Sequence, residues 1–229
     1  MKRLTTLALA GTLTSLLAVT GAVAAPKLER VRGTIESAED GSVSVKTSDG
    51  KTQKIAIAPD TAVVNVVTSS LDNVKDGVFI GTATKEGTDP LEAIEVVIFP
   101  DSMRGTGEGH YAWDAIIDTA GGGKAVKSSM TNGTVKAGSG GSKVKSSMTN
   151  ATVQKSESSG DRKTLTVSYD KDQSKTIVVP PKAPIVAFEK ADKSILKPGG
   201  KIFVVATEDG GKLTAKLAGV GKDGVTPPM

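Results

Sequence analysis

Residues 42–58 read SVSVKTSDGKTQKIAIA, and this stretch decides the fold class. Apolar and polar residues alternate before and after Asp49-Gly50, which is the period-two pattern of strands with one buried face. Asp-Gly is a strong hairpin signal because a type I′ turn needs two residues that tolerate positive φ. The stretch therefore predicts two antiparallel strands joined by a tight turn.

The same plan extends outward on both sides, between Arg30 and Phe99. Short apolar runs follow one another, separated by turn residues, and none has the 3.6-residue period of a sustained helix. One short helix is expected at 69–74. Five or six short strands with one brief helix are typical of a small Greek-key barrel of the OB type.

Residues 148–221 repeat this order at an offset of about 122 residues. Val43-Ser44-Val45 recurs as Leu165-Thr166-Val167, and Val74-Lys75-Asp76-Gly77 recurs as Leu196-Lys197-Pro198-Gly199. Further matches keep the same order, which indicates an internal duplication. We therefore predict an all-β fold: two tandem small OB-like β-barrels, one from each copy, joined by a Gly/Ser/Lys-rich segment.

The N-terminus has the pattern of a secretory signal peptide. Met1-Lys2-Arg3 is basic, residues 4–19 are apolar, and Ala22-Val23-Ala24 is a small-x-small cleavage signature. We therefore expect a protein of the periplasm or a secreted protein. The expected organisation is a signal peptide at 1–24, an acidic first barrel at 25–100, a junction segment and linker at 101–147, and a basic second barrel at 148–229.

Composition excludes several classes of site. The chain has no Cys, which rules out disulfides, a thiol nucleophile and Cys-ligated metals, and its single His rules out multi-His metal sites. No stretch after residue 25 is long and apolar enough for a membrane span. The four Phe residues fall within expected strands and are expected to fill the core, which leaves no aromatic platform for stacking bases, so nucleic acid is not an expected partner.

Charge is divided unevenly along the chain. Residues 26–119 carry 9 Lys and Arg against 16 Asp and Glu, whereas residues 120–229 carry 18 against 9. The net charges of −7 and +9 suggest that an acidic and a basic lobe attract each other, within one molecule or between molecules. Unrelated drift of two solvated surfaces is the alternative. The Lys-rich linker suggests a third reading, an anionic envelope polymer as partner.

The segment 101–114 concentrates the residues that could form a site. It holds the single His and the single Trp of the chain, and its candidates are Arg104, Glu108, His110, Tyr111, Trp113 and Asp114. Tyr111 and Trp113 are two residues apart, so in an extended segment they face the same way and can wedge between two barrels. His110 then points to the other side, and Arg104 has Glu108 and Asp114 nearby in the sequence for an ion pair.

Two chemical readings of this segment are kept as alternatives. His110 with Glu108, Asp114 or a Met would suit a divalent metal or copper, although the spacing is not diagnostic. A hydrolase would need a Ser nucleophile and an orienting acid for His110, and the chain has no G-x-S-x-G elbow. We expect no catalytic residue, no resident metal and no cofactor.

Four stretches carry a resemblance to a known family. They are PDSMRGTGEGHYAWD at 100–114, SSMTNATV at 146–153, LKPG at 196–199 and GKDGVTPPM at 221–229. The chain resembles exported proteobacterial proteins of unassigned function, similar to domain-of-unknown-function families with OB-like barrels. The resemblance implies this fold and no activity, and the metal-transporter permease label that some members carry does not suit a chain without membrane spans. The doubled SSMTN segment, at 128–132 and 146–150, departs from the family.

These observations together favour a non-enzymatic, exported two-barrel binding or interaction module. A periplasmic metal-binding protein that uses the His110 segment is the first alternative, and a hydrolase centred on His110 is the second. The partner, an unknown protein or an anionic envelope polymer, and the oligomeric state are left open by the sequence.

Overall fold

The computed structural model describes residues 27–113, 116–117, 143–144, 146–170 and 172–228. Within these residues the fold is all-β, as the sequence predicts, and no helix reaches seven residues. The short helix expected at 69–74 is a single 3₁₀ turn, η1 (Leu71–Asn73). No helix in the described part of the chain is long and apolar enough to cross a membrane.

The strands range from two to fourteen residues and follow the alternating patterns and short apolar runs of the sequence. In chain order they are β1 (Lys27–Glu39), β2 (Ser42–Thr47), β3 (Thr52–Ala56), β4 (Ala62–Thr68), β5 (Phe79–Lys85), β6 (Leu91–Ile98), β7 (Gly109–Ala112), β8 (Ile116–Ile117), β9 (Lys143–Val144), β10 (Ser146–Ser159), β11 (Arg162–Tyr169), β12 (Gln173–Val179), β13 (Ile185–Lys190), β14 (Lys201–Asp209) and β15 (Lys212–Gly221). Two further 3₁₀ turns are η2 (Asp101–Met103) and η3 (Lys193–Ile195).

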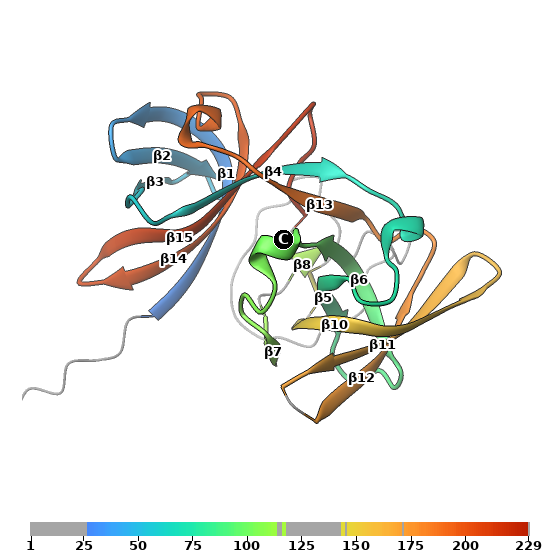
Figure 1. Ribbon diagram of the computed structural model, residues 1–229. Coiled ribbons are helices and arrows are strands. Elements are labelled where there is room, and N and C mark those ends of the chain that lie inside the picture. Colours follow the sequence, from blue (N-terminus) through green and yellow to red (C-terminus); the bar gives the residue numbers. More distant parts are fainter. Residues whose placement is uncertain (1–26, 114–115, 118–142, 145, 171, 229) are drawn as a thin grey trace, which may run out of the picture.

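Five strands form a closed ring of pairings that we call the first circuit, in the order β1-β2-β3-β15-β14 and back to β1. All its pairings are antiparallel except the one that closes it, where β3 and β15 run parallel over two residue pairs. Figure 1 shows these strands gathered at the upper left. The first circuit therefore combines three strands from the start of the chain with two from its end.

A second circuit has the same order, β10-β11-β12-β6-β5 and back to β10. It too is closed by a parallel contact of two residue pairs, between β12 and β6. It takes three strands from the second half of the chain and two from the first. Figure 1 shows it at the lower right.

β4 and β13 join the two circuits. They pair with each other in antiparallel fashion, with Val66 opposite Phe188. β4 also runs parallel to β15, and β13 parallel to β6. Each of these two strands therefore carries the chain from one circuit to the other.

The pairing crosses the boundary that the sequence analysis draws between the two barrels. We expected the strands of residues 25–100 to pair among themselves, but β1 pairs with β14 and β5 pairs with β10. The alternating pattern fixes which residues form strands. Because both halves have the same strand plan, it does not fix which half supplies the partner.

Irregularities of the strands recur at corresponding places in the two circuits. The β1–β2 register shifts between Ile35 and Ser37, and the β10–β11 register shifts between Val153 and Lys155. The β14–β15 and β5–β6 hairpins have matching shifts as well. Ile35 and Val153 therefore occupy corresponding positions on β1 and β10.

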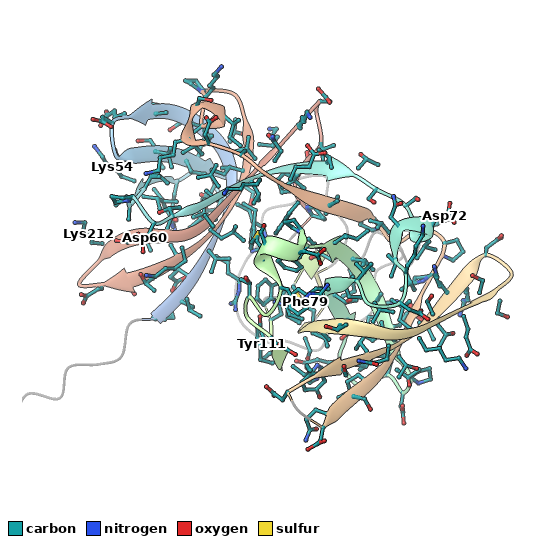
Figure 2. All side chains as sticks on the ribbon, viewed as in Figure 1. Lys54, Asp60, Asp72, Phe79, Tyr111 and Lys212 are labelled. Atoms are coloured by element: carbon teal, nitrogen blue, oxygen red, sulfur yellow. The ribbon has the colours of Figure 1, made fainter. Side chains whose placement is uncertain are left out.

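Three buried clusters fill the structure. One lies inside each circuit, and the third, which we call the junction core, draws residues from both circuits and from β4 and β13. The prediction that all four Phe residues are buried is confirmed, and all four belong to the junction core. Figure 2 shows the labelled Phe79 within the second circuit, on the side toward the first. The largest apolar side chains therefore hold the circuits to each other rather than fill their interiors.

Exchange of strands also mixes the two charge classes of the sequence. Each circuit contains strands from the acidic first half and from the basic second half of the chain. The hypothesis of one acidic and one basic lobe therefore has no counterpart in the arrangement of the described strands.

The exchange predicts that neither half of the chain folds alone. A fragment of residues 25–117 lacks β14, β15 and β10–β12, so we expect it to show no cooperative unfolding as a monomer. Mixing it with a fragment of residues 143–229 should restore the fold, because the two supply all described strands. Circular dichroism and sedimentation of each fragment and of the mixture would measure this. A monomeric 25–117 fragment that unfolds cooperatively would contradict the exchange.

Candidate functional site

The junction segment is held along β10. β7 pairs with β10 over Gly109–Ala112, opposite Ser147–Asn150. Just beyond β7, the backbone N–H of Trp113 donates to the carbonyl oxygen of Ser146 at 2.9 Å. The second SSMTN copy is thus part of β10, and the first copy, at 128–132, lies outside the described residues.

Asn150 fixes the loop that precedes β7. Its side chain is buried, and Nδ2 donates to the carbonyl oxygen of Thr106 and to the hydroxyl oxygen of Tyr111, both at 3.3 Å. Gly81 of β5 leaves room for this amide, since a Cβ there would lie 2.6 Å from Asn150 Oδ1. The glycine-rich loop is therefore anchored from β10.

Trp113 lies between the two circuits, where the sequence analysis places it. It packs against the junction core, and the Arg30 guanidinium carbon of β1 lies 3.7 Å from its ring centroid. The Tyr111 ring is 6.0 Å from that of Trp113. Tyr111 remains exposed, and Figure 2 shows it on the side of β7 that faces the first circuit. This stacking connects the junction segment to β1.

Arg104 makes structural contacts with the backbone nearby. Its Nη2 donates to the carbonyl oxygen of Gly77 at 2.9 Å and to the Asp101 carboxylate at 2.6 Å. These contacts differ from the expected pairing with Glu108 or Asp114, and Asp114 lies outside the described residues. Arg104 therefore ties η2 to the turn before β5.

His110 faces away from Tyr111 and Trp113, as alternation requires. Its Nδ1 is 2.8 Å from Thr149 Oγ1, and its ring centroid is 6.3 Å from that of Tyr169. Partial burial, followed by the charge of Lys175, lowers the His110 pKa below 6.5. The imidazole is thus neutral at pH 7 and takes part in a hydrogen bond to a threonine hydroxyl.

The metal and hydrolase hypotheses gain no support from the described residues. There, no three His, Asp or Glu side chains come together as a metal site would need. Glu108 is exposed. Of the serines considered as nucleophiles, Ser146 is buried and Ser147 half-buried, while Ser128 and Ser129 lie outside the described residues. Both hypotheses stay predictions.

The His110 environment can be checked by titration. We expect an NMR midpoint below 6.5 for this imidazole, and a higher midpoint in Lys175→Gln because a repelling positive charge is removed. Lys155→Gln, at an exposed residue paired with Glu157, is the matched control and should leave the midpoint unchanged. A midpoint above 6.5 in the wild type would show that the ring is not held in this environment.

A buried carboxyl group lies on the second-circuit side of the junction. Glu95 of β6 is 2% exposed, and its Oε1 has no hydrogen-bond partner among the described residues. Burial raises the Glu95 pKa from 4.5 to about 8, although the charge of Arg32 on β1 acts in the opposite direction. Glu95 is therefore protonated at pH 7, which suits its apolar surroundings.

Glu95 should make the stability of the protein depend on pH. A carboxyl whose pKa is raised on folding stabilises the folded state below its unfolded pKa, and this contribution is lost as pH rises toward the folded value. The free energy of unfolding of the wild type should therefore fall, relative to that of Glu95→Gln, by up to about 5 kcal/mol between pH 4.5 and 8. This is the free-energy equivalent of the rise in the Glu95 pKa. Urea unfolding at several pH values measures this. Glu86→Gln, at an exposed turn residue, is the control and should have the same pH dependence of stability as the wild type. A difference between the wild type and Glu95→Gln that does not change with pH would refute the raised pKa of Glu95.

A groove of about 660 Å³ opens on the first circuit. Its walls come from β1, from the β2–β3 hairpin and from the β14–β15 hairpin. The lining residues are Glu29, Arg30, Val31, Arg32, Thr47, Ser48, Asp49, Gln53, Lys54, Glu208, Gly211 and Leu213. Most are polar and both signs of charge are present, so the groove suits a polar ligand rather than an apolar one.

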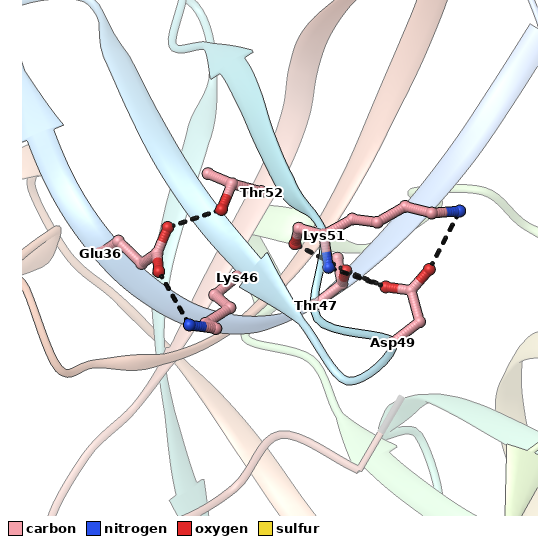
Figure 3. Close-up of polar contacts among 6 residues, drawn as sticks. All are labelled: Glu36, Lys46, Thr47, Asp49, Lys51 and Thr52. Atoms are coloured by element: carbon pink, nitrogen blue, oxygen red, sulfur yellow. Dashed lines mark hydrogen bonds and ion pairs between the residues drawn. The ribbon is translucent and has the colours of Figure 1, made fainter. Parts of the chain in front are cut away.

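Polar contacts hold the β2–β3 hairpin, whose turn borders this groove, as Figure 3 shows. The Thr47 hydroxyl can donate to the Asp49 carboxylate or, at 2.9 Å, to the carbonyl oxygen of Lys51. On β1, Glu36 accepts a hydrogen bond from Thr52 at 2.7 Å and pairs with Lys46 at 3.5 Å. The contacts of Glu36 tie the hairpin to β1 through residues that do not line the groove, and the contacts of Thr47 hold the turn that borders the groove.

None of the groove residues was among the candidates from the sequence. The alternation in Glu29-Arg30-Val31-Arg32 places two arginines on one side of a strand, and this is the one local pattern that could have drawn attention to this region. Gln53 gave no signal, because its place in the groove depends on strands that come from opposite ends of the chain.

Comparisons of the chain with protein-family models, with curated proteins and with solved structures find no match. The function therefore has to be argued from the residues themselves.

Proposed function

We propose that this protein is a non-enzymatic, exported binding module built from two OB-like barrels, with the groove of the first circuit as its ligand site. The observation that carries the proposal is the groove itself, which is lined mostly by polar residues and by charges of both signs. Export rests on the signal-peptide pattern at 1–24.

The barrel assignment is supported by the order of the strands. Each circuit has five strands, and a short parallel contact closes an otherwise antiparallel ring. A five-stranded Greek-key barrel of this size is the OB architecture. The matching register shifts in the two circuits support an internal duplication in which the copies exchanged their last two strands.

The position of the groove supports a binding role. OB barrels bind ligands on the face of their second and third strands, next to the loop between the fourth and fifth. The groove is lined by β2 and β3 residues such as Thr47 and Gln53, and by Glu208 and Gly211 from the β14–β15 hairpin, which occupies the place of that loop. Its mixed charge argues against a uniformly anionic ligand such as nucleic acid.

Filling the groove should abolish binding without unfolding the protein. Gln53→Trp places a bulky ring on the half-buried groove side of β3, so we expect loss of binding to the ligand found by screening the mature protein against envelope polysaccharides, lipopolysaccharide and peptide libraries. Thr52→Trp is the matched control, because Thr52 is exposed on the other face of the same strand and does not line the groove. Equal unfolding midpoints would show that both variants fold.

The proposal fails if no class in the screen binds, or if bound ligand is insensitive to Gln53→Trp. Binding that requires an added divalent metal and is lost in His110→Ala would instead support the metal-binding alternative.

A further inference from the structure

Two hairpins of the chain have a backbone that fits beside β1. The β14–β15 hairpin pairs there, and the β5–β6 hairpin pairs with β10 instead. Both hairpins are antiparallel, and each has one extra residue on its second strand, at the register shift after Val205 or after Ala83. The two backbones are therefore equivalent, and the choice between them has to rest on side chains.

The register shifts define which side chains to compare. Two positions before the shift lie Phe203 on β14 and Gly81 on β5. The matching shifts on β1 and β10 relate Arg32 to Asn150 in the same way. The structure places Phe203 opposite Arg32 and Gly81 opposite Asn150. We call these two combinations the matched pairs, because they occupy the same place in the two circuits and differ in every side chain.

Asn150 needs a glycine on the strand beside it. A Cβ at position 81 would lie 2.6 Å from Asn150 Oδ1, which is closer than two such atoms can come. The amide uses this space while its Nδ2 reaches Thr106 and Tyr111. If β14 took the place of β5, Phe203 would stand opposite Asn150 and would displace the amide from these contacts. β10 therefore accepts the hairpin that carries glycine here.

Arg32 suits the opposite choice. Its guanidinium carbon lies 5.1 Å from the centroid of the Phe203 ring, within the range of a cation–π interaction. The Phe203 ring is 1% exposed and belongs to the junction core. Gly81 in its place would remove this ring from beside Arg32 and would leave a cavity in the core.

The next cross-strand pair along the strands is sorted in the same direction. Thr82 lies opposite Thr149 in the second circuit, and Val204 lies opposite Val31 in the first. All four side chains are buried. A different choice of hairpin would place a threonine opposite a valine in both circuits, whereas Thr–Thr pairs and apolar pairs are units that stabilise a sheet.

We propose that the matched pairs, Gly81 with Asn150 and Phe203 with Arg32, specify the exchange of hairpins between the two circuits. They are thereby positioning residues for the groove, because the β14–β15 hairpin forms one of its walls only when it pairs with β1. The inference concerns how the groove is assembled and does not depend on what the groove binds.

Engineered disulfides can report the pairing, since the chain has no Cys. Lys27 lies opposite Glu208, and the same correspondence would place Glu86 opposite Lys27 if β5 took the place of β14. Directly opposite residues of antiparallel strands are close enough for a disulfide. The full mature protein is refolded in a glutathione redox buffer, and its disulfides are mapped by mass spectrometry.

In the otherwise wild-type protein, Lys27→Cys/Glu208→Cys should form its disulfide at least about tenfold more than Lys27→Cys/Glu86→Cys does. A preference for the second cysteine pair would overturn the proposal, because the exchange that the matched pairs are meant to specify would not occur.

Exchange of two side chains between the hairpins tests the matched pairs directly. In Gly81→Phe/Phe203→Gly, the preference between the two cysteine pairs should reverse to at least about tenfold in the other direction. Ile80→Val/Ile202→Val is the matched control, because it changes buried positions that are alike in both hairpins, and it should keep the wild-type preference. A folded Gly81→Phe/Phe203→Gly variant with the wild-type preference would overturn the proposal.

A milder set of variants decides the case in which that double variant does not fold. Gly81→Ala should lower the urea unfolding midpoint of the wild type, and should lower that of Asn150→Ala by less, because the clash with the amide is then absent. Equal losses in the two backgrounds would show that the two residues are not coupled, and would overturn the proposal.

Discussion

The antiparallel pairing of β4 with β13 is the contact on which the rest of the architecture depends. Ser69 N donates to the Ile185 carbonyl at 2.8 Å, and Ala191 N donates to the Val63 carbonyl at 3.0 Å, so the two strands hold each other extended from end to end. If the chain reversed its direction after β4, β5 and β6 would join the first circuit and pair beside β1. Because β4 runs on alongside β13, those strands are delivered to the second circuit, and β14 and β15 are delivered to the first.

Exchange makes the boundary between the circuits a true core. Phe79, Phe99 and Phe188 pack in tilted and edge-to-face pairs, with ring centroids 5.4 and 5.2 Å apart, and Phe203 of β14 belongs to the same cluster. Tight packing of large side chains resists relative motion. The junction also brings Arg32 of the first circuit close enough to the buried carboxyl group of Glu95 for the arginine charge to act on the Glu95 pKa. The two circuits are therefore fixed to each other, and Trp113 can span from one to the other.

The two circuits differ where the chain leaves them. After β6 the chain turns at η2 and comes back along β10 as β7, covering the open part of that strand. After β15 the chain instead reaches the junction core, where Val225 packs. The corresponding part of β1 lines the groove.

The sequence by itself determined the strands, the turns and the burial of the four Phe residues, because period-two alternation and residues such as Asp49-Gly50 act within a few positions of the chain. It also placed Trp113 between two strand groups, since Tyr111 and Trp113 share one face of an extended segment. Only the tertiary structure decided which half supplies each partner strand, because β5 and β14 offer equivalent edges to β1. That choice brings Glu208 beside Thr47 and Gln53, residues from opposite ends of the chain, and so creates the groove that no local pattern could reveal.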